Sequence, residues 1–215
     1  WGIATGRSLY QLIEGLNEAG FPFLPDFVIV REREIFFPGQ FGRWVPDENW
    51  NKKCEKDHNR LFRKCKRVLA KIRDHVEGNT NARWVSVEGD AAGIVSSTEE
   101  EMDEILRIIE SLTLHSDLTF ERNSIYLRFS HRAYRKGTCL QEAANRWGLE
   151  CDKILAIGDN YNDLSMLQPE ICEACGCPSN AIREVRDYVT ERGGKVAANP
   201  GSVGVMEVMK HYFDQ

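Results

Sequence analysis

No run of apolar residues in this 215-residue chain approaches the roughly 20 residues that a membrane-spanning helix requires. Positive charge is not in excess either, and the net charge of −5 argues against a general nucleic-acid binder. The sequence contains no internal repeat and no low-complexity tract. With 42% hydrophobic and 28% charged residues, the composition indicates an ordinary soluble globular protein, long enough for one large domain or two small ones.

Disulfide bonds are not expected. The seven cysteines are an odd number in a chain too long to need covalent cross-links, so we predict a reducing, cytoplasmic location. Cys172, Cys175 and Cys177 form a Cys-x-x-Cys-x-Cys cluster that could hold zinc or an iron–sulfur centre. A tetrahedral site needs a fourth ligand, and no nearby cysteine pair or histidine supplies one. We therefore favour small, buried side chains of a core strand.

Two α/β stretches flank a middle of different character. Residues 1–30 predict a strand ending at Thr5, a helix over 8–19 and a strand over 27–30. The pattern resumes after Arg135, where we expect strands at 154–157, 173–175 and 188–190, and helices at 137–147, 160–166, 181–186 and 203–212. These stretches predict a Rossmann-like, mainly parallel α/β core made of residues 1–31 and 131–215.

Residues 32–130 read as an inserted α+β cap. We expect strands at 34–37, 43–45, 84–87, 93–95, 118–120 and 124–129, a long amphipathic helix through residues 61–76, and a second helix opened by a capping box of Thr98 and Glu101. The order of helix, two strands, helix and two strands predicts an antiparallel sheet with both helices on one face. Residues 52–67 are rich in Lys and Arg and could attract an anion. The apolar spacing favours a single helix with a solvated basic face.

The stretch from Lys153 to Asp163 carries the strongest chemical signal. A short apolar strand and Gly158 lead to Asp159, and Asp163 follows four residues later. Two neighbouring carboxylates repel each other, and a divalent cation with a preference for oxygen ligands, such as Mg²⁺, would remove that repulsion. The alternative is that Asp159 only caps a helix.

Two further motifs could bind phosphate. Thr5-Gly6-Arg7 follows the first strand, where a hydroxyl and free backbone amides would suit a phosphate oxygen. Lys136-Gly137 lies where the predicted cap returns to the core, and a lysine there could neutralise a phosphate. Taken singly, a plain helix cap and an ordinary solvated lysine explain them equally well.

In this order, Thr-Gly-Arg, Lys-Gly and Gly-Asp-x-x-Asn-Asp-x-x-Met resemble the phosphatases of the haloacid dehalogenase superfamily. The resemblance is closest to the subfamily with a large cap between the second and third motifs, which includes sucrose-phosphate phosphatase-like and Cof-like enzymes. It implies Mg²⁺-dependent hydrolysis of a small phosphorylated metabolite, plausibly a sugar phosphate. It gives no indication of the oligomeric state.

The resemblance also implies roles for single residues. Asp159 and Asp163 would hold the metal, while Thr5, Gly6, Lys136 and Asn162 would contact the phosphoryl group. Asn180 matches a family asparagine beside the opening of the active site. Further candidates for contact with the rest of the substrate are Arg7, Arg43 and Trp44; Arg43 and Trp44 lie in the predicted cap, which should decide substrate choice.

One motif of the superfamily has no counterpart here. The Asp-x-Asp triplet, whose first aspartate is the nucleophile and whose second is the general acid and base, occurs nowhere in the 215 residues. We expect that a β-α step of on the order of 30 residues precedes Trp1 in the natural protein, and that the chain by itself does not turn over p-nitrophenyl phosphate. The core sheet should then lack its central strand and have two unpaired edges. A catalytically inactive binding module and a phosphotransferase such as a phosphomutase remain alternatives.

Overall fold

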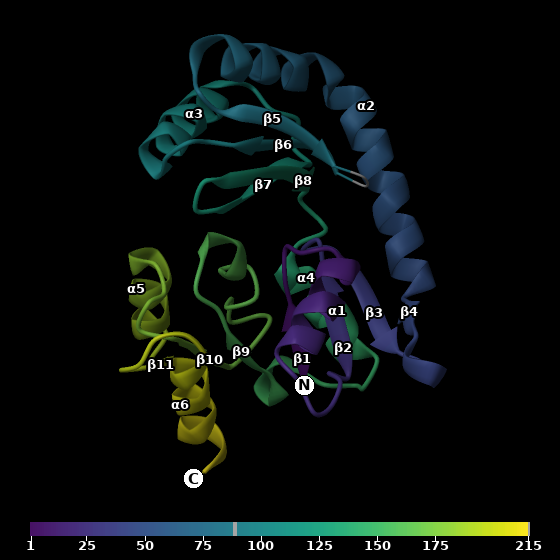
Figure 1. Cartoon of the computed structure of the whole chain (residues 1–215), viewed down its shortest axis with the longest axis vertical. Helices are drawn as coiled ribbons and strands as arrows, with labels where there is room; N and C mark the ends of the chain where they lie inside the picture. Colours follow the sequence, from purple (N-terminus) through teal and green to yellow (C-terminus); the bar gives the residue numbers. More distant parts are fainter. Residues whose placement is uncertain (88–89, 215) are drawn as a thin grey trace. The chain divides into compact units, whose positions relative to one another are not determined.

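The computed structural model describes residues 1–87 and 90–214 and divides into two compact units (Figure 1). The first unit contains residues 1–52 and 134–215, and the second contains residues 53–133. The first boundary therefore falls about twenty residues later than the sequence predicts. The reason is that the strand after residue 31 turns back and pairs with the core strand before it, instead of starting a separate sheet.

A four-stranded sheet forms one half of the first unit. Its strands, in the order β1-β2-β3-β4, are β1 (Gly2–Ala4), β2 (Phe27–Val30), β3 (Glu34–Pro38) and β4 (Trp44–Pro46). β1 and β2 are parallel, whereas β3 and β4 are antiparallel to their neighbours. β2 is buried on both faces because Val28 and Val30 pack with α1 (Leu9–Glu18) and Ile29 packs with α4 (Lys136–Asn145). This explains why its sequence is uninterrupted by polar residues.

A separate three-stranded parallel sheet forms the other half. Its order is β11-β10-β9, with β9 at Leu155–Ile157, β10 at Ala174–Cys177 and β11 at Lys195–Val196. Among the described residues, β1 pairs only with β2 and β9 pairs only with β10. Each of these two strands therefore has one unpaired edge, as the sequence predicts for a core without a central strand.

Two elements predicted after residue 159 are wrong. Residues 188–190 are not a strand but belong to helix α5 (Arg183–Glu191), because Val185 and Val189, four residues apart, both pack against β10 and its neighbours. Residues 160–166 are not an α-helix: only a short 3₁₀ turn, η3 (Tyr161–Asp163), forms there. Another 3₁₀ turn, η2 (Cys151–Lys153), precedes β9, and α6 (Gly201–Phe213) ends the unit.

The second unit has its own core. Its antiparallel sheet has the order β5-β6-β8-β7, with strands β5 (Arg83–Val87), β6 (Asp90–Val95), β7 (Leu118–Asn123) and β8 (Tyr126–His131). The long helix α2 (Glu48–Asn79) and α3 (Glu99–Ser111) contribute apolar side chains to one cluster with these strands. Thr98 caps α3 by accepting from the Glu101 amide, while the Glu101 carboxylate accepts from the amides of Ser97 and Asn81.

The remaining short element is η1 (Gln40–Gly42), between β3 and β4. Within the described ranges, no helix is both long and apolar enough to span a bilayer.

Candidate active site

Asp163 is the centre of a buried polar cluster in the first unit. It lies in η3, and only 5% of the residue is exposed. Its Oδ1 accepts a 2.6 Å hydrogen bond from Nζ of Lys136, and its Oδ2 accepts from the amides of Asp159 (2.8 Å) and Asn160 (3.0 Å). A Cβ at Gly158 would lie 2.9 Å from Cγ of Asp163, so only glycine allows the chain to turn this closely around the carboxylate.

Lys136 reaches Asp163 because α4 begins next to the loop that carries this carboxylate. Lys136 is the first residue of α4 and is 4% exposed. The backbones approach closely at the next residue, where a Cβ on Gly137 would lie 2.6 Å from the carbonyl carbon of Ser165. The Gly137 amide donates to Oγ of Ser165 at 3.2 Å. Lys136 and Asp163 therefore form a buried, hydrogen-bonded ion pair.

Asp159 follows β9 and Gly158 and is the exposed member of the cluster. Partial burial of its carboxyl group is the largest cause that raises its pKa, and the neighbouring Asp163 carboxylate raises it further, while Lys136 opposes both. Asp159 is not a helix cap, because the side chain that accepts from the Tyr161 amide belongs to Asn160. Its carboxylate is the one that faces solvent beside a second negative charge, which is the arrangement that a cation would stabilise.

The Thr5 loop lies at the carboxyl end of β1. The Thr5 amide donates to the carbonyl of Ile29, which fixes the loop beside the end of β2. Oγ1 of Thr5 accepts from the Arg7 amide at 3.1 Å, and the hydroxyl proton remains a potential donor to a ligand. The Arg7 side chain is exposed and lies beside Gly15 of α1.

Glu32 joins this loop to the Asp163 cluster, and the sequence did not predict it. Its amide donates to the carbonyl of Thr5 at 3.0 Å, and its Oε1 accepts a 2.7 Å bond from Nδ2 of Asn162. Glu32 is 7% exposed and Asn162 is 2% exposed. The signal that could have found Glu32 is its position two residues after the end of β2, a largely buried strand that is parallel to β1.

Residues 26–192 match the family model of the haloacid dehalogenase-like hydrolases. The chain belongs to this family. A curated relative, phosphoglycolate phosphatase of Methanothrix thermoacetophila, is 30% identical over 111 residues, which is 52% of this chain and 46% of that protein. The match therefore spans about half the length of the curated relative.

Several solved structures share the fold of this chain. A sucrose-phosphatase of Synechocystis, determined in complex with sucrose and phosphate, has a TM-score of 0.73 and 16% identity, and the similarity covers 98% of this chain and 83% of that one. A sugar phosphatase of subclass IIB of the superfamily has a TM-score of 0.55 and 19% identity, covering 98% and 84% of the two chains. These similarities show an α/β core with an inserted antiparallel cap.

Of three other predicted contact residues, Asn180 and Trp44 have contacts elsewhere in the chain and Arg43 is exposed. Oδ1 of Asn180 accepts a 2.7 Å bond from the amide of Gly201, which stabilises the start of α6. Trp44 packs against the cluster of Leu12 and Val28 on the α1 side of β2, and Arg43 is exposed beside it. The proposed contact of Asn180 with substrate rests on the family resemblance, and that of Arg43 and Trp44 on the expectation that the cap selects the substrate.

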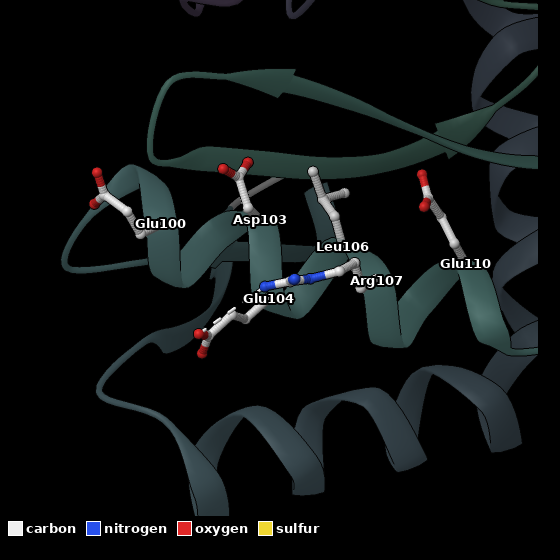
Figure 2. Close-up of a pocket in the computed structure, with 6 residues that line it drawn as sticks. All are labelled: Glu100, Asp103, Glu104, Leu106, Arg107 and Glu110. Atoms are coloured by element: carbon white, nitrogen blue, oxygen red, sulfur yellow. Dashed lines mark ion pairs between the residues drawn. The ribbon is translucent and has the colours of Figure 1, made fainter.

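The second unit has two charged surfaces without a predicted site residue. The Lys and Arg side chains of α2 within the predicted stretch 52–67 are exposed, as expected for a solvated basic face. An open hollow runs along α3, and its lining is mostly acidic, formed by Glu100, Asp103, Glu104, Leu106, Arg107 and Glu110 (Figure 2). Its charge does not suit a phosphate monoester.

The three cysteines of the Cys-x-x-Cys-x-Cys cluster are buried. Cys172, Cys175 and Cys177 are at most 1% exposed, and within the described residues no group of three or more His, Cys, Asp or Glu side chains could hold a metal ion. The Arg192 side chain donates to the carbonyls of Leu167 and Cys172 and so holds the backbone beside these thiols in place.

We expect these three thiols to react slowly. Burial raises the pKa of the Cys172 and Cys175 thiols, and raises that of Cys177 to about 11, so little thiolate forms at pH 8. With 5,5′-dithiobis(2-nitrobenzoate) at pH 8, they should label at least about 100-fold more slowly than the partly exposed Cys151, and at similar rates in 8 M urea. Rapid labelling of all three thiols in the folded protein would contradict their burial.

Proposed function

We propose that this chain provides the metal-binding and phosphate-binding groups of a Mg²⁺-dependent phosphatase that hydrolyses a small phosphate monoester, in particular a phosphorylated sugar. The observation that carries the proposal is the cluster in which a buried lysine and two aspartates meet beside the end of β9. Acidic groups that repel each other, next to a lysine, match the needs of a cation and a phosphoryl group bound together.

Asp159 and Asp163 suit Mg²⁺ by their donor chemistry. A carboxylate offers about four acceptor positions, and Asp163 already uses three of them for Lys136 and two amides. Asp159 is therefore the main protein ligand and Asp163 the second. Two carboxylates are sufficient because Mg²⁺ keeps several waters and binds phosphate oxygens directly. When bound, the ion would neutralise charge on the transferring phosphoryl group.

The chain's own groups would position the phosphoryl group. The hydroxyl of Thr5 can donate to one phosphate oxygen, and the loop at Gly6 lets the backbone approach another. Lys136 contributes a positive charge from the start of α4, while Asn162 contributes an amide next to Asp163.

The nucleophile would come from a segment outside these 215 residues. In the superfamily an aspartate attacks the phosphorus, and water then hydrolyses the aspartyl-phosphate, so that one difficult step becomes two easier ones. The unpaired edges of β1 and β9 support this proposal, because a strand that pairs with both would bring its carboxyl end between the Thr5 loop and Asp159.

The substrate class rests on the relatives. One solved relative is named a sucrose-phosphatase, another a sugar phosphatase, and the curated relative a phosphoglycolate phosphatase. All three names are those of phosphatases that act on small phosphate monoesters. We propose that Arg7, Arg43, Trp44 and Asn180 contribute to recognition of the part of the substrate that carries no phosphate.

Thermal unfolding with and without Mg²⁺ tests the metal site. We expect Asp159→Asn to raise the Tm without metal, because it removes a carboxylate whose ionised form is disfavoured, and to abolish the increase in Tm that Mg²⁺ causes in the parent. Since the pKa of Asp159 is raised, the parent's Mg²⁺ response should disappear on acidification at a higher pH than an ordinary aspartate would predict. Asp152→Asn, on the exposed η2 turn, should keep the full response. An undiminished response in Asp159→Asn would refute the site.

A further inference from the structure

Glu32 lies on a turn whose backbone is unusual for its sequence. Arg31 has φ of 48° and Glu32 has φ of 66°, both in the left-handed region that favours Gly and Asn. A hydrogen bond closes this turn, since the Arg33 amide donates to the carbonyl of Val30 at 3.1 Å. Consecutive non-glycine residues in this conformation are strained, and such strain is often retained where a side chain has a function.

The carboxylate of Glu32 lies among groups that the proposed function assigns to phosphate. Oε1 lies against the Thr5 loop, since a Cβ on Gly6 would be 3.0 Å from this oxygen. The same Oε1 accepts the 2.7 Å bond from Nδ2 of Asn162. Two phosphate-binding elements are thus in contact with a negatively charged oxygen of the protein itself.

The contact also fixes the direction of the Asn162 amide. A carboxylate only accepts hydrogen bonds, so the NH₂ group of Asn162 must face Glu32. Its Oδ1 is then directed elsewhere, and this atom is buried without a hydrogen-bond partner in the described structure. Asn162 therefore cannot offer its NH₂ group to phosphate unless the contact with Glu32 is broken.

We propose that Glu32 is an internal competitor of phosphate, a carboxylate that occupies the anion site and reduces its affinity for inorganic phosphate and other small phosphate anions. This inference rests on the proposed function. A ligand must displace the carboxylate to gain Asn162 and the Gly6 loop, so only a monoester with additional contacts outside the phosphate is bound tightly. Glu32 thus discriminates the substrate against the free phosphate that its hydrolysis releases.

Calorimetric titration of the 215-residue chain with inorganic phosphate in the presence of Mg²⁺ tests this. Glu32→Gln keeps the size of the side chain and an oxygen that can accept from Asn162, but removes the charge. Glu32→Gly removes the side chain and relieves the left-handed backbone. We expect both variants to bind phosphate roughly tenfold more tightly than the parent, because like charges no longer meet in the site. In Glu32→Gly, the NH₂ resonances of Asn162 should shift when phosphate is added.

Two controls separate the possible outcomes. Glu34→Gln neutralises a glutamate two residues away that pairs with Arg31, and it should leave phosphate affinity within about twofold of the parent. Thr5→Val should weaken phosphate binding in the Glu32→Gln background if the proposed function is right. Suppose that Thr5→Val weakens phosphate binding in the Glu32→Gln background, but Glu32→Gln itself binds phosphate no more tightly than the parent. The inference about Glu32 is then wrong and the phosphate site stands. If none of the proteins binds phosphate, both are wrong. A Glu32→Gly variant that is merely more stable, with unchanged affinity, would show that Glu32 only strains the turn.

Discussion

Asp163→Asn should lower the free energy of unfolding by about 3–5 kcal/mol, because it leaves the ammonium group of Lys136 buried without its counter-charge. The side chains of the two residues are only 5% and 7% exposed, so water cannot replace the lost partner. An asparagine has one acceptor oxygen in place of two, so it cannot accept from Lys136 and from the amides of residues 159 and 160 at the same time. Relief of the repulsion on Asp159 offsets little of this loss, since Asp159 is exposed. Urea unfolding measures the difference.

An exposed pair provides the matched control. Lys153 and Asp152 are 3.0 Å apart, but their side chains are 67% and 52% exposed. Asp152→Asn should change stability by less than about 1 kcal/mol. The double variant Lys136→Met with Asp163→Asn should be clearly less destabilised than the two single changes added together, because neither charge is then left alone. Strict additivity would show that the pair does not interact in solution.

Gly137→Ala should destabilise the protein by about 1–3 kcal/mol and also weaken binding of Mg²⁺ and phosphate. The added methyl group would collide with the backbone at Ser165, which cannot move aside as a flexible side chain could. Helix α4 would therefore shift away from the η3 loop, and Lys136 at its start would lose its 2.6 Å contact with Asp163. Urea unfolding and phosphate titration measure the two effects.

Gly78→Ala is the control for this change. Gly78 is also helical, in α2, but a Cβ there would meet nothing within 4 Å. Alanine at this exposed position should stabilise the helix by about 0.5–1 kcal/mol, because glycine is the poorer helix former. Equal destabilisation by both alanines would mean that the close approach at Gly137 does not constrain the site.

Local patterns predicted most of the elements. The four apolar residues of β2 and the helical spacing from Leu61 to Val76 allow only one burial pattern each, and the structure has both. The pattern was misleading at 188–190, where Tyr-Val-Thr has high β-propensity but the spacing of Val185 and Val189 places their side chains on one helical face against the sheet. It was also misleading at 160–166, where the carboxylate of Asp163 accepts the amides of residues 159 and 160 and holds the chain in a short turn.

The position of the boundary between the units could not be predicted from local pattern. β3 looks like the start of the inserted part, because polar residues separate it from β2. Its pairing with β2 depends on the left-handed turn at Arg31 and Glu32, and those residues carry none of the Asn-Gly signal that normally marks such a turn.

The sequence by itself indicated the family and most of the strands and helices. It also singled out the acidic, hydroxyl and lysine residues proposed for the site, since each is marked by a short motif at the end of a strand or the start of a helix. Only the tertiary structure decided how those groups are engaged. It pairs Lys136 with Asp163 and leaves Asp159 exposed. It also brings Glu32, after the end of β2, into hydrogen-bond contact with Asn162, 130 residues later in the chain. Contacts of that kind depend on which strand ends lie side by side and on a strained turn, and neither is encoded in the residues next to them.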